Sequence, residues 1–464
     1  MIGQLTHHGH ELTSQPAEAD VIVINTCSFI DPAKQESVDT ILEMAEYKKT
    51  GRAKRLIVAG CLVERYRADI QKNIPDVDAV LGTNELGKIT ALCEGLAPEE
   101  TAPEPYLYHD LTARVMTTPR HSAYIKIAEG CDHPCSFCII PQFRGKFRSR
   151  RPESVVNEAT RMFRSGVREI NLIGQDTTCY GEDFGMKDGL ADLLSRLATI
   201  PVEAPTWIRV LYVYPNKITQ KLLDTIAEHP ALVKYIDVPL QHASARVLKR
   251  MKRGANADIF LKLLERIRAT IPDVAIRTSM IVGFPGETRE DFDELCAFAK
   301  AAQFDRLGVF SYSDEETSGS FHLEGKVDKR TIYNRKRTLM ALQRRISLDA
   351  NRKLIGKELP VLVEGPSEET ELLWRGRLAT QAPEIDGICY INDFGPSSET
   401  PQPGEIRLLR VTQAHDYDLI GELVDTPESL APKQNLASSP FRIIPAHSSP
   451  TVYAAARTEA MPAR

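Results

Sequence analysis

The sequence predicts an α/β protein with three domains, and three observations lead to this prediction. The chain has 464 residues, which is enough for about three domains of ordinary size. Strand-like and helical patterns alternate over residues 1–97 and again over 121–354, the order typical of parallel α/β sheets. Short strand-like runs separated by Gly and Pro follow over 355–425, and these favour a small β-barrel.

Composition indicates the class of protein. Hydrophobic residues make up 42% of the chain and charged residues 26%, as in ordinary globular proteins. No apolar run reaches 18 residues, and the N-terminus has no charged-then-apolar signal pattern, so we expect a cytoplasmic protein without a membrane partner. Nine scattered cysteines fit metal binding or catalysis better than a disulfide framework. The net charge of −5 argues against binding of polyanions by the whole chain.

Residues 1–97 are expected to form a small α/β domain. The runs 20–25 and 55–60 have the pattern of buried strands, and a helical segment between them predicts that they are parallel. Cys27 and Cys61 directly follow these two strands, at the edge where parallel sheets bind ligands. The two cysteines can therefore face one crevice, or they can be separate buried thiols of purely structural importance.

The start of the chain has no strand of its own. Residues 1–8 resemble the middle of a helix, with no capping residue and no strand before it. A sheet without its first strand would have an unprotected edge. We therefore expect that the natural gene product begins upstream of Met1.

The central domain is predicted as an open, partial (β/α)6 barrel. Residues 98–120 contain four prolines among acidic and small residues, and this composition predicts a linker. Six strand-like runs separated by helical segments follow within 121–354. The runs are 123–127, 169–173, 207–212, 235–240, 275–282 and 306–312. Catalysis in such barrels takes place at the carboxyl ends of the strands, so the loop after the first run is of most interest.

That loop contains three cysteines in the sequence GCDHPCSFC. Cys131, Cys135 and Cys138 are four and three residues apart, so their thiolates can converge on one iron–sulfur cluster. Three thiolates leave one iron of a 4Fe–4S cube open for the amino and carboxylate groups of S-adenosylmethionine, whose sulfonium bond the cluster can cleave to a 5′-deoxyadenosyl radical. Zinc is the alternative metal, with His133 as the nearby fourth ligand.

Polar residues after two other strands are candidate contacts of S-adenosylmethionine. Gln175 and Asp176 follow the second strand-like run, and Gln241 and His242 follow the fourth. Each could contact the cofactor at the carboxyl edge of the barrel. Each could equally be a loop-capping group, and His242 could be a buried core histidine.

Arg277 and two glycines complete the candidate cofactor-binding residues. Arg277 lies on the fifth strand-like run, where its guanidinium could bind the methionyl carboxylate or form a structural ion pair. Gly283 and Gly286 belong to the sequence GFPGE, and glycine lets the backbone approach a ligand closely. The Lys-Ser/Thr pair of a phosphate-binding loop is missing from this sequence, which disfavours a nucleotide triphosphatase.

The C-terminal third changes in charge. Residues 329–353 have a helical pattern with nine basic residues and one acid, Asp349; this helix could contact RNA or could be a solvated connector that balances an acidic neighbour. Residues 355–425 contain five basic and fourteen acidic residues, so this barrel should repel phosphate and favour a basic partner. Residues 426–464 are polar and rich in proline, which predicts a disordered tail.

With these motifs assembled, the chain resembles the methylthiotransferase family of radical S-adenosylmethionine enzymes over residues 1–425. The resemblance implies an N-terminal methylthiotransferase domain, a radical S-adenosylmethionine barrel and a TRAM-like β-barrel. His133 and the pair Ile140–Pro141 are more similar to the branch that modifies an aspartate of a small-subunit ribosomal protein than to the tRNA branch. The motifs are NTCSFI, GCL, GCDHPCSFCIIPQFRG, IGQDTTCYG, LYVYPN, DVPLQHAS, IVGFPGET and HDYDLIGEL.

The resemblance implies two 4Fe–4S clusters and two molecules of S-adenosylmethionine per turnover. The cluster on Cys131, Cys135 and Cys138 would generate a radical that takes hydrogen from the β-carbon of the target aspartate. The second cluster would carry the sulfur that is methylated by another S-adenosylmethionine. Phe137 fits the cofactor loop of the superfamily. The alternatives are a tRNA adenosine methylthiotransferase and a non-catalytic ribosome-associated binding protein; the electron donor and the sulfur donor are not identified.

One feature departs from the family pattern. The resemblance implies three cysteine ligands in the N-terminal domain, and here Cys27 and Cys61 match two of them. The unmatched cysteine belongs to the same segment as the missing first strand. We therefore expect a start codon assigned too late, and the alternative is an incomplete second cluster.

Overall fold

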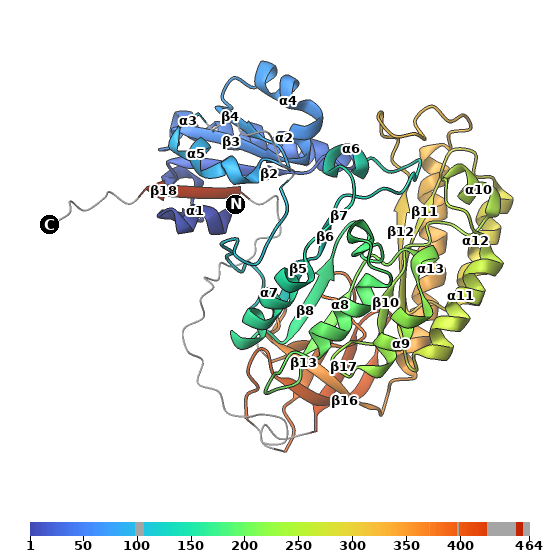
Figure 1. Cartoon of the computed structure of the whole chain (residues 1–464). Helices are drawn as coiled ribbons and strands as arrows, with labels where there is room; N and C mark the ends of the chain where they lie inside the picture. Colours follow the sequence, from blue (N-terminus) through green and yellow to red (C-terminus); the bar gives the residue numbers. More distant parts are fainter. Residues whose placement is uncertain (98–105, 371, 397–398, 425–451, 458–464) are drawn as a thin grey trace.

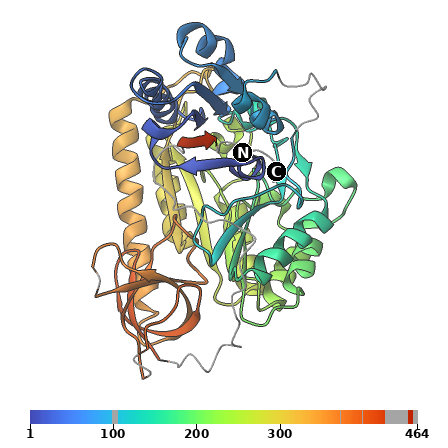
Figure 2. The same ribbon diagram turned by 90° about the vertical axis from the view of Figure 1, so that its left-hand side faces the viewer.

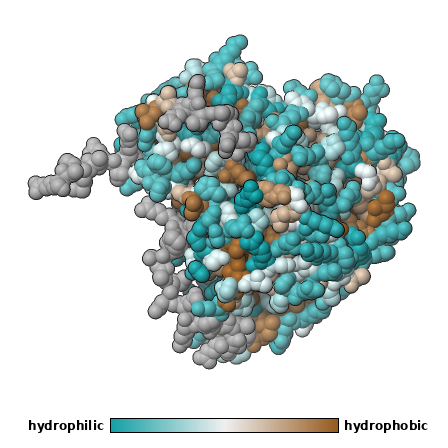
Figure 3. Space-filling view, viewed as in Figure 1, coloured by the Kyte–Doolittle hydropathy of each residue, from teal (hydrophilic) through white to brown (hydrophobic). Residues whose placement is uncertain are grey.

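The computed structural model describes residues 1–97, 106–370, 372–396 and 399–424, together with the backbone of 452–457. An α/β domain and a closed β-barrel lie at opposite ends of a central α/β domain (Figures 1 and 2). The predicted fold class is confirmed by this arrangement. Within the described residues, no helix is long and apolar enough to span a bilayer. Polar residues predominate on the face in Figure 3, and apolar residues form small separate patches.

The N-terminal domain is a five-stranded sheet in the order β1-β18-β2-β3-β4. Strands β2, β3 and β4 are parallel, as predicted for the first two. Alternate residues of β2 and β3 are buried on opposite faces of the sheet, which explains why both strands are apolar throughout. The elements are α1 (Ile2–His7), β1 (His10–Thr13), β2 (Val21–Thr26), α2 (Asp31–Ala45), α3 (Tyr47–Thr50), β3 (Arg55–Gly60), α4 (Cys61–Asn73), β4 (Ala79–Leu81) and α5 (Ile89–Glu94).

The prediction of a disordered tail over 426–464 is wrong for one segment. Strand β18 (Val452–Arg457) lies between β1 and β2 and is antiparallel to both, and it covers the sheet edge that the sequence led us to expect unprotected. An open edge offers unpaired N–H and C=O groups to any extended segment, and VYAAAR contains no proline or glycine to prevent pairing. The polar composition of the whole tail concealed this short strand. Residues 425–451 and 458–464 lie outside the described residues.

The central domain contains the six predicted parallel strands, in two three-stranded sheets with the orders β5-β8-β9 and β10-β11-β12. The largest apolar core lies between these strands and the helices outside them. Thr219, Asn256 and Thr288 cap three of the helices by accepting backbone N–H groups. The elements are β5 (Ser122–Lys126), α7 (Pro152–Arg164), β8 (Glu169–Ile173), α8 (Gly189–Ala198), β9 (Trp207–Val210), α9 (Gln220–Glu228), β10 (Tyr235–Asp237), α10 (Ala245–Arg250), α11 (Ala257–Thr270), β11 (Ala275–Val282), α12 (Arg289–Ala302) and β12 (Arg306–Ser311).

Helix α13 (Lys329–Arg352) connects the central domain to the C-terminal barrel. Its bounds match the predicted helix, and Figure 2 shows it along one side of the molecule, from near the N-terminal domain to the β-barrel. The five strands of that barrel close in the order β13-β14-β15-β17-β16. They are β13 (Glu358–Pro366), β14 (Trp374–Leu378), β15 (Cys389–Asp393), β16 (Ile406–Ala414) and β17 (Leu419–Leu423).

A buried ionic cluster joins the β-barrel to the central domain. The carboxylate of Glu169 on β8 accepts Nη2 of Arg377 on β14 at 2.6 Å and Nη2 of Arg209 on β9 at 3.1 Å. The side chains of all three residues are at most 2% exposed. Burial raises the pKa of Glu169, but the two guanidinium groups outweigh burial and lower this pKa to about 2. The central domain and the β-barrel therefore share a charged core.

Candidate active site

The cysteine loop begins at a short hairpin after β5. Strands β6 (Ala128–Glu129) and β7 (Arg148–Ser149) are antiparallel and bring the two ends of the loop together. Gly130 between them has φ +82°, and a Cβ there would overlap the carbonyl of Lys146, so this turn requires glycine. The N–H of Gly130 donates to Oε1 of Gln175 at 2.9 Å. Gln175 therefore supports the backbone of the loop, and its contact with a cofactor stays a prediction.

The three thiols of this loop are free and half-buried. Burial raises the pKa of Cys131 and of Cys138 to about 11, and the charges of the neighbouring cysteines contribute to both increases. Sγ of Cys135 lies 3.6 Å from Nη1 of Arg253. Thiols whose pKa is raised by burial and by neighbouring thiolates ionise when a cation such as iron binds to them. The donor set therefore fits one 4Fe–4S cluster with three protein ligands.

Contacts made by residues within the cysteine loop fix it to the rest of the central domain. The Ser136 hydroxyl donates to the carbonyl of Arg250 at 2.8 Å, and the Ser136 carbonyl accepts the N–H of Ser320 at 2.8 Å. Phe137 packs against the main apolar core. The loop is thus positioned at the carboxyl edge of the strands, where the sequence predicts the chemistry; cofactor contact by Phe137 stays a prediction.

His133 is bound to groups other than the three thiols. Its Nε2 lies 2.5 Å from Oδ2 of Asp176, and its ring stacks on Tyr214 with the centroids 3.7 Å apart. Arg253 lies over the same tyrosine ring, 4.4 Å from its centroid. Asp176 therefore orients the histidine, and these contacts give no support to zinc bound by His133 and the three cysteines. Tyr214 and Arg253 were missed by the sequence reasoning, although Tyr214 belongs to the quoted motif LYVYPN.

Gln241 and His242, the second pair of polar candidates, lie in different environments. Gln241 has φ +74° and is half-buried, and its backbone pairs with Met280 on β11. His242 is fully buried and accepts the N–H of Ser244 at 3.0 Å. Burial lowers the pKa of His242 to about 4, so the ring is neutral at pH 7. The alternative of a core histidine describes His242 best; cofactor contact by Gln241 stays a prediction.

Arg277 forms structural ion pairs, which was one of its two predicted roles. Its Nη1 donates to Oδ1 of Asp237 at 2.8 Å, and its Nε lies 3.8 Å from Asp386 of the β-barrel domain. The same Asp386 accepts the hydroxyl of Tyr235 at 2.7 Å. Because Arg277 is near the amino end of β11, it meets the β-barrel. Binding of the methionyl carboxylate by Arg277 stays a prediction.

Gly283 and Gly286 have φ of +81° and +83°, so both positions favour glycine. A Cβ at Gly283 would overlap Ile332 of α13, and one at Gly286 would lie 3.0 Å from Arg250. The N–H groups of the turn are held by Oε2 of Glu287. Side chains of the protein itself therefore lie close to these glycines, in the space that was expected for a ligand. A ligand contact of the two glycines stays a prediction.

The two N-terminal thiols lie next to each other at the interface with the central domain. The Ser28 hydroxyl, beside Cys27, donates to the carbonyl of Cys61 at 3.0 Å. Sγ of Cys61 accepts Nη2 of Arg144 at 3.3 Å, and Arg144 ends α6 (Ile140–Arg144), directly after the cysteine loop. Burial raises the pKa of Cys61, Arg144 lowers it and the charge of Cys27 raises it. Cys27 and Cys61 supply two thiols, one fewer than the cysteine loop does. These two thiols alone therefore do not provide three protein ligands for a second 4Fe–4S cluster.

A charged group lies beside Cys61 and was not predicted. Lys126 at the end of β5 pairs with Glu129, whose Oε1 lies 3.5 Å from Nη1 of Arg144. All three side chains are at least two-thirds buried. Two cations therefore share one carboxylate here, which leaves net positive charge near Cys61. Lys126 and Glu129 are three residues apart in the sequence, and folding brings Arg144 at the end of α6 to this pair.

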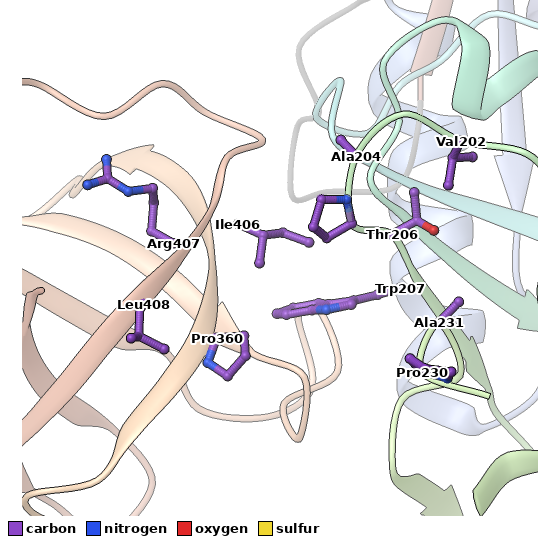
Figure 4. Close-up of a pocket in the computed structure, with 11 residues that line it drawn as sticks. Val202, Ala204, Thr206, Trp207, Pro230, Ala231, Pro360, Ile406, Arg407 and Leu408 are labelled. Carbon is purple, nitrogen blue, oxygen red and sulfur yellow. The ribbon is translucent and has the colours of Figure 1, made fainter. Parts of the chain in front are cut away.

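An apolar groove of the described residues lies elsewhere. It has a volume of about 480 Å³ and lies between the central domain and the β-barrel. Figure 4 shows the Trp207 ring extending toward Pro360 and Ile406 across this groove. Trp207 begins β9, so the groove is at the amino ends of the strands. It is therefore separate from the candidate active site.

Three family models match the chain. They are the Radical SAM superfamily over residues 125–299, Uncharacterized protein family UPF0004 over 1–82 and the TRAM domain over 355–424. Each model falls within one of the three structural domains. The TRAM model corresponds to the closed five-stranded barrel, as the resemblance implied.

Curated relatives match almost the whole chain. Ribosomal protein uS12 methylthiotransferase RimO of Solibacter usitatus is 71% identical over 92% of this chain and 92% of its own length. The protein of the same name from Koribacter versatilis is 57% identical over 91% of this chain and 93% of its own. The protein of the same name from Myxococcus xanthus is 47% identical over 94% of this chain and 89% of its own length. The chain therefore belongs to the RimO family of methylthiotransferases, with a radical S-adenosylmethionine domain at its centre.

Proposed function

We propose that this protein attaches a methylthio group to the β-carbon of an aspartate in ribosomal protein uS12. The reaction uses two molecules of S-adenosylmethionine, one as the source of a radical and one as the methyl donor. The observation that carries the proposal is the trio of free thiols on one loop. The helix after this loop reaches Cys61 of a second domain through Arg144, in a chain 71% identical to a uS12 methylthiotransferase.

Cys131, Cys135 and Cys138 hold the first cluster in this proposal. When bound there, the cluster supplies the electron that cleaves S-adenosylmethionine to a 5′-deoxyadenosyl radical. The β-carbon of aspartate carries no hydrogen that a side-chain base could remove at neutral pH, so radical chemistry is required. His133 and Asp176 keep the loop in position through their 2.5 Å contact.

The positive group of Lys126 and Arg144 orients the substrate. It lies beside Cys61 and adjoins the cysteine loop through α6, the place where the methylthio group and the target carbon must meet. An aspartate side chain that enters there would pair with one of the two cations, because Glu129 neutralises only one of them. Such a contact would present the β-carbon next to the carboxylate in one fixed direction.

Cys27 and Cys61 are the protein's ligands for the second cluster, which carries the sulfur. Because the two thiols are fewer than the trio offers, the cluster count needs a direct measurement. Iron quantitation after anaerobic reconstitution should give about eight iron atoms per chain for two clusters and about four for one. No bound iron would favour the non-catalytic binding protein.

The β-barrel favours a protein over tRNA as the partner. Its excess of nine acidic charges repels phosphate and attracts a basic ribosomal protein. The protein would act in the cytoplasm, where ribosomal proteins are found.

The proposal is tested by mass spectrometry of uS12 after incubation with reconstituted protein, S-adenosylmethionine, a reductant and sulfide. The expected result is one methylthio group on one aspartate, and none after Cys135→Ala. Cys296→Ala is the matched control, because this half-buried thiol is on α12, away from both sets of cysteines. Transfer to a tRNA adenosine with uS12 left unmodified would overturn the proposal.

A further inference from the structure

One face of α13 is occupied by arginine. Residues seven apart lie on the same face of a helix, and Arg330, Arg337 and Arg344 have this spacing, as do Arg345 and Arg352. All five are exposed. At 1.5 Å per residue, the 24-residue helix presents them along about 36 Å. We call these five residues the arginine stripe.

The opposite face of α13 packs against the central domain. Leu339 and Ile346 are buried, and Gln343 donates to the carbonyl of Phe304 at 2.7 Å. Arg335 also belongs to this inner face, where it pairs with Glu287 at 3.0 Å. The helix is therefore fixed by one side, and the arginine stripe necessarily points to solvent.

Most of the arginine stripe has no acidic partner. Arg344 pairs with Asp416 of the β-barrel at 3.3 Å, and Arg352 lies 3.7 Å from Asp349 of its own helix. In the described part of the chain, no carboxylate lies within 4 Å of Arg330, Arg337 or Arg345. A connector that balances an acidic neighbour therefore accounts for one arginine of the five.

An uncompensated basic helix face has a cost, because like charges on neighbouring turns repel each other. Surface helices usually mix both signs of charge. The cost is offset when a polyanion covers the face. Tyr333, 63% exposed near the start of the helix, adds an aromatic ring on which an unpaired base can stack.

We propose that the arginine stripe binds the phosphate backbone of RNA. The surface is distinct from the acidic β-barrel at the end of the same helix (Figure 2), so the two regions fit an RNA and a basic protein that lie side by side. A ribosomal subunit has this composition. The RNA contact would hold the enzyme on its substrate particle, and this last step rests on the proposed function.

The first test measures RNA binding alone. A variant with Arg330→Gln, Arg337→Gln and Arg345→Gln is compared with the parent by fluorescence anisotropy, using a labelled RNA duplex over a series of salt concentrations. The matched control changes Arg120, Arg164 and Lys187 to Gln, since these exposed basic residues lie outside α13 and have no ion pair of 4 Å or less in the described residues.

The stripe variant should bind the duplex about tenfold more weakly or worse, and its salt slope should fall by about two to three, because each lost phosphate contact contributes about one. The control should retain the affinity and slope of the parent. A parent that does not bind RNA, or a stripe variant with unchanged slope, overturns the proposal. Binding of polyglutamate in place of RNA would overturn it in favour of an acidic protein partner.

The second test compares two substrates, intact small subunits and isolated uS12. The ratio of kcat/KM on subunits to kcat/KM on isolated protein should fall about tenfold in the stripe variant and stay constant in the control. An unchanged ratio would contradict the docking role. If the parent modifies neither substrate, the proposed function fails, and the anisotropy result still decides RNA binding.

Discussion

Removing the charge of Glu169 tests whether the β-barrel and the central domain are one folding unit. Glu169→Gln leaves the guanidinium of Arg209 buried without its charged partner, although its hydrogen bonds to the carbonyl oxygens of Ala379 and Gln381 remain. Arg377 keeps its contact with Glu364 at 2.6 Å. Breaking a buried ion pair by removal of one partner costs about 3–5 kcal/mol.

The pKa of Glu169 gives an independent value for the free energy that the ion pairs contribute to stability. Its decrease from 4.5 to about 2 corresponds to about 3 kcal/mol of stabilisation. Because this pKa is lowered in the folded state, the stabilisation is present above pH 4.5 and is lost as the pH falls toward 2. The two estimates agree.

Calorimetry is the assay for this variant. The entropy of unfolding is about 2.1 cal/mol/K per residue, so a unit of about 300 residues loses about 1.6 °C per kcal/mol. Glu169→Gln should therefore lower the midpoint of the transition that includes the domain interface by about 5 °C. Glu153→Gln is the control, because Glu153 is 67% exposed in its pair with Arg196, and such a pair contributes about 0–1 kcal/mol. The double change Glu169→Gln with Arg209→Met should cost less than the sum of its parts. Equal midpoints for Glu169→Gln and the control would show that the ionic cluster does not stabilise the domain interface.

Three further changes have expected outcomes. Gly283→Ala should cost about 1–3 kcal/mol, because φ is +81° and the new methyl meets Ile332; thermal unfolding should show no comparable loss for Gly254→Ala, which has no neighbour within 4 Å. His242→Gln should flatten the decrease in unfolding free energy between about pH 6.5 and pH 4, because the unfolded histidine binds a proton before the buried one does; an unchanged pH profile would contradict the burial of a neutral ring. Glu315→Gln should speed hydrogen exchange in α2 and α4, because Glu315 is 3% exposed and joins the N-terminal domain through Lys34 and Arg65, each at 2.9 Å; protection equal to the parent would show that this contact does not hold the interface.

Local sequence patterns were sufficient for the domain order and the cysteine loop. Strands buried on both faces are apolar throughout, so the runs at 20–25 and 55–60 were recognised from composition alone. The cysteine loop was recognised because Cys131, Cys135 and Cys138 lie close together in the sequence. Both features depend on neighbours in the sequence, and the structure shows the parallel strands and places the loop directly after β5.

Features that depend on distant residues were not predictable. The role of Arg277 was left between two alternatives, because its position on a strand says nothing about Asp386, which lies more than 100 residues later and meets it only after folding. Arg144 reaches Cys61 across a domain interface. Strand β18 forms because a sheet edge needs a partner, and a composition average over the tail does not show which residues supply one.

The most direct test of the account is cleavage of S-adenosylmethionine by anaerobically reconstituted protein with a chemical reductant. The parent should release 5′-deoxyadenosine, and Cys131→Ala, Cys135→Ala and Cys138→Ala should each abolish this release and lower the iron content by about four atoms. Cys296→Ala should behave as the parent does. Release of 5′-deoxyadenosine that persists without the three thiols, or an iron-loaded parent that releases none, would show that these cysteines do not hold the cluster that cleaves S-adenosylmethionine.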